Sequence, residues 1–251
     1  MQKVNLGGKP GTNNPVSRRE RKKRQNRVRL LQCAYEAMGN EKGGKLSIAY
    51  ITDAADIGFG TFYNYFDSME DLASQVLTYV VNDVGRRNDL ATISLKTADP
   101  AAVQAMSIRL LIREMLSEPM WRWWLNRPQV LVERMTLFLR PFGIRDFKLG
   151  VDADQYKVEE KDAEIILSQI TWMIIGGVID IREKRSVGLD EAKLIEIIMR
   201  AMGVPHNNAR RLAEMELPGI TKANLDFSDQ LAPVLSVLLP NSKRTKKYKR
   251  M

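Results

Sequence analysis

The chain has 251 residues, 44% of them hydrophobic and 27% charged, which is typical of a soluble globular protein with one large domain or two modest ones. The single cysteine, Cys33, excludes an intramolecular disulfide and a cysteine-rich zinc site, and the single histidine, His206, excludes a histidine-rich metal site. The net charge of +9 is concentrated in two basic segments, 18–29 and 243–250. These two segments carry more positive charge than the whole chain, so the rest is mildly acidic and a polyanion would be attracted to the ends.

Residues 1–17 are rich in Gly, Pro and Asn and are predicted to be a disordered arm. Ser17 is a suitable N-cap for a helix that runs to about Met38. The first half of this helix is the basic segment. Its second half has an apolar stripe at spacings of three and four residues, and Cys33 is expected to be a small buried thiol on that side.

A second short helix is expected after Ser47, followed by a turn at residues 55–57 and a third helix over 58–65. Phe62 and Phe66 are four residues apart and are predicted to be buried, which leaves several other aromatic residues of this segment exposed. Ser68 begins an approximate capping box for a helix that extends to about Arg87.

After residue 90 the pattern is helical and contains no strand series. Helices are predicted over residues 100–116, 129–139, 159–184, 190–202, 206–215 and 228–238, with an irregular segment at 141–158. The predicted fold class is therefore all-α. We expect a disordered arm at 1–17, a three-helix domain of helix-turn-helix type at 18–68, a larger helical domain at 69–240 and a basic tail at 241–251.

Residues 28–72 resemble the DNA-binding domain of the TetR/AcrR family of bacterial transcription regulators. The resemblance depends on Ile51, Ala55 and Ile57, on the segment Gly60-Thr61-Phe62-Tyr63-Asn64-Tyr65-Phe66, and on Ser68-x-x-Asp71-Leu72. It implies an N-terminal DNA reader and a helical C-terminal domain that senses a ligand and forms a homodimer. Outside this segment, the chain matches the family only in its organisation as a helical C-terminal domain.

The segment departs from the family pattern at several positions. Asp56 replaces the usual glycine of the turn, but Asp tolerates a left-handed conformation better than most residues. Gly58 replaces the usual Ser or Thr cap, Phe59 a frequent Arg, Tyr65 a frequent His and Met69 a common Lys. The recognition region is thus less positive than usual, and we expect the basic first helix to compensate by neutralising phosphates.

Twelve residues are candidates for DNA binding. Hydroxyl groups, helix N-terminal N–H groups and basic side chains suit phosphate oxygens, and an asparagine can read adenine through two hydrogen bonds. For Gly60, close approach to DNA and packing against a neighbouring helix remain alternatives, and Phe59 belongs either to the interface or to the core. The set is Arg18, Arg19, Arg21, Lys22, Ser47, Gly58, Phe59, Gly60, Thr61, Tyr63, Asn64 and Tyr65.

The larger domain contains most of the methionine and tryptophan residues, which suit either an adaptable apolar ligand pocket or an ordinary core. The candidate pocket residues are Met106, Leu110, Met115, Trp121, Trp124, Met135, Phe138, Trp172 and Met173. The two helices 159–184 and 190–202 are candidates for a four-helix dimer interface. Its candidate residues are Ile165, Ile166, Gln169, Gly176, Gly177, Leu194, Ile197, Ile198 and Ala201.

These patterns favour a sequence-specific, ligand-responsive DNA-binding regulator, more specifically a homodimeric repressor of a near-palindromic operator with an apolar small-molecule effector. The alternative is a DNA-architectural or constitutive DNA-binding protein without an effector. No catalytic constellation is recognisable, so an enzyme, a cofactor and a metal are not expected. The chain also lacks a leader-like apolar stretch at its N-terminus, and its longest apolar run, residues 170–179, is half a membrane span. We therefore expect a cytoplasmic, nucleoid-associated protein without membrane contact.

Overall fold

The computed structural model describes residues 17–40, 46–95, 99–219, 223 and 225–228. Within these ranges the chain forms nine α-helices, three short 3-10 helices and no strand. The prediction of an all-α fold is therefore confirmed. The predicted N-terminal arm, most of the predicted helix 228–238 and the basic tail lie outside the described residues.

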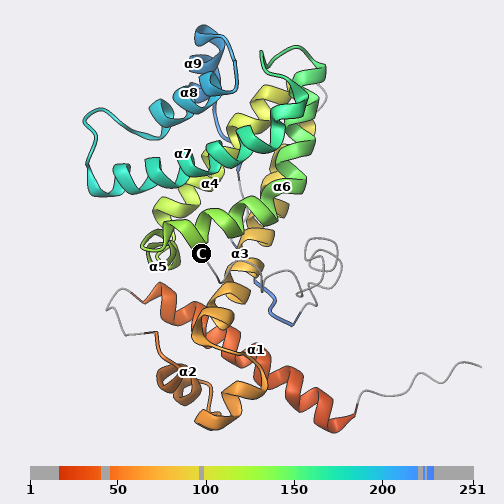
Figure 1. Cartoon of the computed structure of the whole chain (residues 1–251), viewed down its shortest axis with the longest axis vertical. Coiled ribbons are helices and arrows are strands. Elements are labelled where there is room, and N and C mark those ends of the chain that lie inside the picture. The colour runs from red at the N-terminus through yellow and green to blue at the C-terminus, as the bar shows by residue number, and fades with distance from the viewer. Residues whose placement is uncertain (1–16, 41–45, 96–98, 220–222, 224, 229–251) are drawn as a thin grey trace, which may run out of the picture.

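A small group of helices forms one end of the elongated molecule (Figure 1). It consists of α1 (Arg18–Gly39), α2 (Ile48–Ala54), the 3-10 helix η1 (Phe59–Asn64) and the first turns of α3 (Met69–Ala91). The buried side chains of α1 are Leu30, Leu31, Ala34 and Met38. They pack in one hydrophobic cluster with Ile51 of α2 and Phe62 of η1.

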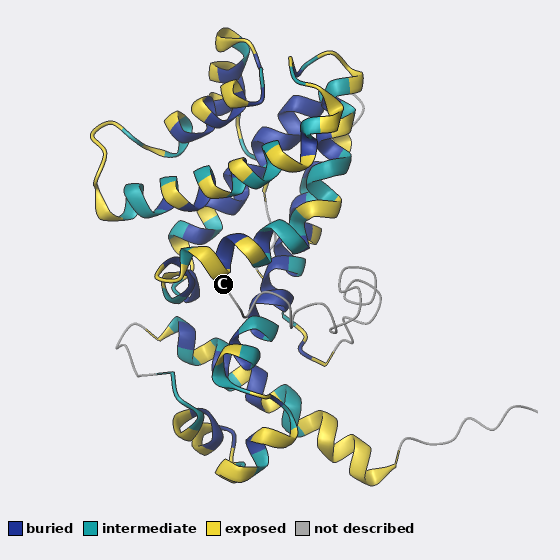
Figure 2. Cartoon of the chain, in the orientation of Figure 1, coloured by how far each residue is buried: buried dark blue, intermediate teal, exposed yellow. Residues whose placement is uncertain are grey.

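The N-terminus of α1 is stabilised by a complete capping box. The Ser17 hydroxyl accepts from the backbone N–H of Glu20 at 3.1 Å, and the Glu20 carboxylate accepts from the N–H of Ser17 at 2.9 Å. Two otherwise unpaired helix N–H groups are thereby satisfied. From this cap to about residue 25 the helix is exposed all round and projects beyond the rest of the domain (Figure 2).

The larger body lies at the other end of α3 and contains six α-helices and two 3-10 turns (Figure 1). The N-termini of α4 and α8 are capped by Asp99 and Asp190, whose carboxylates accept from backbone N–H groups. The elements are η2 (Ile93–Leu95), α4 (Pro100–Ser117), α5 (Met120–Leu125), α6 (Pro128–Asp152), η3 (Glu160–Asp162), α7 (Ala163–Glu183), α8 (Glu191–Ala201) and α9 (His206–Glu214).

The predicted irregular segment 141–158 is wrong over residues 141–152, because α6 continues through Pro141 to Asp152. The prediction rested on the Gly, Asp and Phe content of this segment, and a proline inside a helix also removes one hydrogen bond. Here Pro141 is exposed, whereas Phe138 before it and Phe147 after it are both buried. Tertiary burial on both sides of the proline keeps the two halves of α6 in one helix.

The helix α3 belongs to both ends of the molecule. It begins at the Ser68 cap, whose hydroxyl accepts from the N–H of Asp71 at 3.0 Å, and it ends at Ala91, four residues later than predicted. Its first half packs on α1, and its second half packs on α4 and α6. The expected domain boundary between residues 68 and 69 thus lies at the start of a continuous helix, as the predicted cap at Ser68 implies.

A candidate DNA interface and a cavity in the helical body

The helix-turn-helix unit consists of the capped helix α2, a tight turn and a short segment, residues 58–66, that is called the reader below. The Ser47 hydroxyl caps α2 by accepting from the N–H of Tyr50 at 3.3 Å. After α2 the chain reverses through Asp56, whose φ of 52° lies in the left-handed region. Asp thus occupies the conformation for which the family pattern has glycine, as expected, since its short polar side chain tolerates this region.

The predicted third helix is a 3-10 helix, Phe59–Asn64, with Gly58 as its N-cap. Phe62 and Phe66 are almost completely buried and anchor this segment in the core. Phe59 and Tyr63 are instead 55% and 54% exposed, and Asn64 is exposed beside them. The prediction that the aromatics divide into a buried pair and an exposed group is therefore confirmed, and Phe59 belongs to the exposed group.

Two further residues of the reader differ in their surroundings. A Cβ atom built on Gly60 meets no atom within 4 Å, so in this chain Gly60 does not serve close helix packing. Tyr65 is half-buried, and its hydroxyl accepts from the Asn26 side chain of α1 at 3.1 Å. This bond between α1 and the end of η1 was not predicted, because it joins residues 39 positions apart.

The basic half of α1 presents most of its charge to solvent. Arg18, Arg19, Arg21 and Lys22 are all exposed, as their predicted role requires. Arg27 differs, because its guanidinium donates to the Tyr79 hydroxyl at 3.4 Å and to the Gln75 side chain. The positive surface thus lies on the projecting first turns of α1.

A cavity of about 130 Å³ lies in the body between α3, α4, α6 and α7. Its wall is largely apolar and includes Val84, Ile108, Leu111, Phe142, Leu167 and Ile174. Gly85 of α3 makes room for this arrangement, since a Cβ atom at this position would lie 2.9 Å from the Phe142 ring.

Three side-chain oxygens at the cavity are buried without a hydrogen-bond partner among the described residues: Asn88 Oδ1, Gln104 Oε1 and Thr136 Oγ1. Asn88 and Gln104 are each only 7% exposed. A buried polar atom without a partner is costly and marks a place where another group completes its hydrogen bonds. The apolar cavity therefore offers at least two acceptor oxygens to an occupant.

A charged cluster closes one side of the same cavity. The Arg145 guanidinium donates to Asp146 at 2.7 Å and to Asp89 at 2.6 Å, and all three residues line the cavity. The hydrogen bond that Arg145 donates to Asp146, opposed by partial burial and reinforced by the hydrogen bond to Asp89, raises the pKa of Arg145 above its usual value. The cluster therefore combines fixed charge with hydrogen-bonding atoms at the edge of an apolar space.

The predicted pocket residues are mostly elsewhere. Of the nine, Met135 alone lines this cavity. Trp172 is 43% exposed and Met173 is half-buried on α7, whereas the other six are buried in the core. The composition of the segment indicated a pocket in the right domain, but methionine and tryptophan mainly fill the spaces between helices. Gln104 and Asn88, which sequence reasoning missed, carry no local signal in the sequence.

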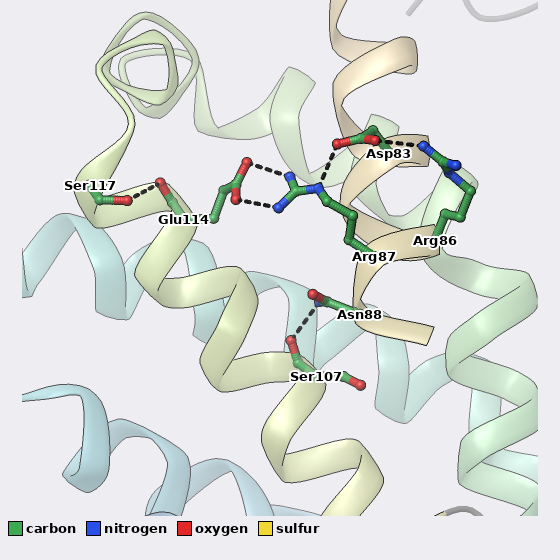
Figure 3. A network of polar contacts seen from close by, with 7 residues as sticks. All are labelled: Asp83, Arg86, Arg87, Asn88, Ser107, Glu114 and Ser117. Atoms are coloured by element: carbon green, nitrogen blue, oxygen red, sulfur yellow. Dashed lines mark hydrogen bonds and ion pairs between the residues drawn. The ribbon is translucent and has the colours of Figure 1, made fainter. Parts of the chain in front are cut away.

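A buried ion-pair network lies beside the cavity and joins α3 to α4 (Figure 3). The Arg87 guanidinium donates to Asp83 at 2.6 Å and to both carboxylate oxygens of Glu114 at 2.9 and 3.2 Å. The next residue, Asn88, donates from its Nδ2 to the Ser107 carbonyl at 3.0 Å while its Oδ1 remains at the cavity. Neighbouring residues of α3 therefore contact the cavity and hold α4.

The predicted dimer residues on α7 and α8 divide into exposed and buried sets. Ile165, Gln169, Gly176, Ile197 and Ala201 are exposed, and Ile165 reaches 66%. Ile166 is half-buried. Leu194 and Ile198 are buried within the chain, and Gly177 allows Leu194 to approach, since a Cβ atom on Gly177 would lie 2.5 Å from that side chain. Leu194, Ile198 and Gly177 thus pack α8 onto α7 within one subunit.

The exposed apolar side of α7 is unusual in extent. By length and composition alone, Glu160–Glu183 is apolar enough to cross a membrane, with a mean hydropathy of 1.5, and only 28% of its apolar window is buried. One such helix is weak evidence for a membrane span. The large apolar residues exposed on α7 are Ile165 and Trp172, and Ile197 of α8 is exposed as well.

Comparisons with known proteins agree with this architecture. The profile of the tetracyclin repressor-like C-terminal domain matches residues 99–215. A crystal structure of RolR in complex with the ligand resorcinol is similar with a TM-score of 0.71 and 29% sequence identity, over 80% of this chain and 100% of that chain. The structure of RolR without ligand is similar with a TM-score of 0.69 and 27% identity, over 77% of this chain and 99% of that chain. A search of curated proteins found no match.

Proposed function

Because this chain belongs to the TetR family of transcription regulators, we propose that it is a homodimeric repressor that releases a near-palindromic operator when a small molecule fills the cavity. The observation that carries this proposal is the path of α3. The same helix contributes Asn88 to the cavity and, at its other end, packs on the helix-turn-helix unit.

The exposed residues of the reader are suited to the major groove. We assign base reading to Asn64, whose amide can make two hydrogen bonds with adenine, and phosphate or sugar contact to Tyr63 and Thr61. Ser47, Gly58, Phe59, Gly60 and Tyr65 complete the surface. The exposed Arg18, Arg19, Arg21 and Lys22 supply the sequence-independent attraction to phosphates.

The effector that fits the cavity is a small aromatic ring with hydroxyl groups. A cavity of roughly 150 Å³ lined by apolar side chains admits benzene, and the present cavity of about 130 Å³ is of similar size. Hydroxyl groups on the ring would donate to Asn88 Oδ1 and Gln104 Oε1, which satisfies two buried acceptors. RolR, which has the same architecture, binds resorcinol, a ring with two hydroxyl groups.

The exposed apolar residues of α7 and α8 favour a symmetric four-helix interface. Ile165, Trp172 and Ile197 are uncovered in the single chain, and a second copy would bury them around a two-fold axis. Two reader segments in one dimer would then meet two half-sites about one helical turn apart. A subunit whose α7 face remained exposed would carry an apolar patch of the kind that marks an interface.

Effector and operator are coupled through α3. A ligand lowers the affinity for DNA if it binds more tightly to the dimer conformation in which the two readers are wrongly spaced for the major groove. DNA must then lower the affinity for the ligand by the same factor. A coupling free energy of roughly 1–3 kcal/mol makes a useful switch. A DNA-architectural protein without an effector, which is the alternative, would have no such coupling.

The proposal is tested by selecting bound sequences from random duplexes. The affinity for the selected duplex is then measured with and without dihydroxybenzenes. Asn64→Ala should cost about 1–3 kcal/mol on the selected site and relax preference at one base pair. The matched control is Asn207→Ala, on an exposed position of α9. The architectural alternative is supported if the selection recovers no preferred sequence. It is also supported if the protein binds the selected duplex equally well with and without each dihydroxybenzene isomer.

A further inference from the structure

The cavity in the body is enclosed by buried and half-buried residues on most of its sides. Among the described residues that line it, Arg140 and Glu164 alone are exposed. Arg140 lies on α6 and Glu164 in the first turn of α7, two helices that pack on each other (Figure 1). The cavity is therefore nearest to solvent between these two helices, and an occupant that enters there meets this pair of residues before the apolar wall.

An ion pair spans this entrance. The Arg140 guanidinium donates to the Glu164 carboxylate, and the two side chains are 48% and 63% exposed. Exposed ion pairs contribute little to stability, because water screens the charges and two long side chains must be held in one geometry. The entrance is thus closed by a contact that breaks readily without unfolding the body.

A second side of the cavity, between α3 and α6, is closed more firmly. Arg145 of α6 contacts two carboxylates, Asp146 on its own helix and Asp89 on α3. Asp146 is buried and Asp89 is half-buried, so solvent screens these contacts less than it screens the exposed pair. Displacing the Arg145 side chain breaks contacts with two acids, whereas displacing the Arg140 side chain breaks a contact with one.

The turn of α6 that carries Arg140 is locally weak. Pro141 follows Arg140 inside the helix and has no N–H to donate to the preceding turn. Gly143 comes two residues later and has a low helix propensity. Phe142 lies between them and is part of the cavity wall. A local outward movement of residues 140–143 therefore costs one backbone hydrogen bond fewer than in an uninterrupted helix, and it displaces both the ion pair and a wall residue.

We propose that small molecules enter and leave the cavity between α6 and α7, through an entrance that the Arg140–Glu164 pair closes and that opens by local movement of residues 140–143. This inference rests on the proposed function for the identity of the ligand and adds how access to the same site is controlled. The pair closes the entrance in the empty and in the filled protein alike. It therefore sets the rates of association and dissociation and leaves the dissociation constant unchanged.

The first experiment measures access to the cavity without an effector. Leu111, a buried residue of the cavity wall on α4, is replaced by Cys in a Cys33→Ser background, so that the single thiol lies at the cavity. The measured quantity is the rate of its reaction with methyl methanethiosulfonate, a small uncharged reagent. Arg140→Gln should raise this rate by about 2- to 5-fold, as the modest strength of an exposed ion pair allows. Pro141→Ala, which restores the missing N–H, should lower it.

The matched control is Lys148→Gln, which breaks another exposed ion pair of α6. Lys148 contacts Glu160 at 2.8 Å, both side chains are more than half exposed, and neither belongs to the described lining of the cavity. This variant removes the same charge and should react at the rate of its parent. Arg140→Glu combined with Glu164→Arg should restore the parent rate, because the pair can form again. A rate that does not change in low concentrations of denaturant shows that the thiol is reached by local opening rather than by unfolding.

The second experiment uses resorcinol and follows binding by stopped-flow tryptophan fluorescence. Arg140→Gln should raise the association and dissociation rate constants by the same factor of about 2 to 5, so that their ratio, the dissociation constant, stays the same. A residue that merely supported the shape of the cavity would change the dissociation constant when it is replaced. Equal acceleration of both rates is therefore the result that identifies an entrance.

The outcomes separate this inference from the proposed function. If no dihydroxybenzene binds, the proposed effector is wrong, and the thiol reaction rates still decide where the entrance lies. If Arg140→Gln reacts at the rate of the Lys148→Gln control, the entrance is not between α6 and α7 and the inference is wrong. It is also wrong if Asp89→Asn accelerates the reaction and Arg140→Gln does not, because the entrance then lies between α3 and α6.

Discussion

Replacing Gln104 by methionine should make the protein more stable and its effector binding weaker. Gln104 is 7% exposed in the body, and its Oε1 has no partner among the described residues. An unsatisfied buried polar group costs about 1–3 kcal/mol, and methionine has a similar length without an acceptor oxygen. We expect Gln104→Met to raise the free energy of unfolding by about 1 kcal/mol.

The same substitution removes one hydrogen bond to the effector. A hydrogen bond contributes about 0.5–1.5 kcal/mol net, so the dissociation constant of a dihydroxybenzene should rise by roughly 2- to 13-fold. Denaturant unfolding gives the first quantity, and calorimetric titration with resorcinol gives the second. The control is Gln129→Met, at an exposed position of α6, which should change neither.

The reasoning is refuted by either of two results. A loss of stability above 1 kcal/mol in Gln104→Met would mean that the amide is satisfied in the free protein. Unchanged resorcinol affinity in a variant that is otherwise folded would mean that Gln104 does not receive a hydroxyl group, and the cavity would then not be the effector site.

Three further results are expected. Burial raises the pKa of the Cys33 thiol, with a smaller contribution from Glu36, so Cys33 stays protonated at pH 7 and should alkylate with iodoacetamide more slowly than after unfolding; equal rates would contradict this. Gly150→Ala would place a Cβ atom 2.1 Å from the buried Tyr156 ring, so the free energy of unfolding should fall by about 1–3 kcal/mol, and an unchanged melting temperature would argue against this packing. Glu114→Ala leaves Arg87 buried without its bidentate partner and should cost about 3–5 kcal/mol in denaturant unfolding, whereas a loss below 1 kcal/mol would show that Asp83 and water suffice.

The helix-turn-helix unit was predictable from sequence because its signals are local. Ser17, Ser47 and Ser68 cap helices in the sequence positions where they were expected, and each acts within three residues of itself. Phe62 and Phe66 are buried as their α-helical spacing predicted, although the helix formed is a 3-10 helix that ends at Asn64 and Phe66 lies just beyond it. Asp56 adopts the left-handed turn conformation because the turn requires it and the side chain allows it.

The cavity and the contact of Phe227 with α3 were not predictable, because they depend on contacts between distant segments. Gln104 and Asn88 come from different helices, and only the packing of α3 on α4 brings both to one space. The course of α6 through Pro141 depends on the burial of Phe138 and Phe147 by other helices. The contact of Phe227 with Tyr79 spans 148 residues, and no periodicity in the sequence reports it.

This last contact has a consequence for the order in which the protein is made. The N-terminal domain is synthesised first and contains the residues of the reader, but the aromatic junction between Tyr35 and Tyr79 is completed by residue 227. Domains generally fold as they emerge, N-terminal part first. A nascent chain that has not reached Phe227 therefore exposes two tyrosine faces at the base of the reader. The junction between α1 and α3 is therefore completed only after residue 227 has been synthesised, and a product truncated before this residue would lack it.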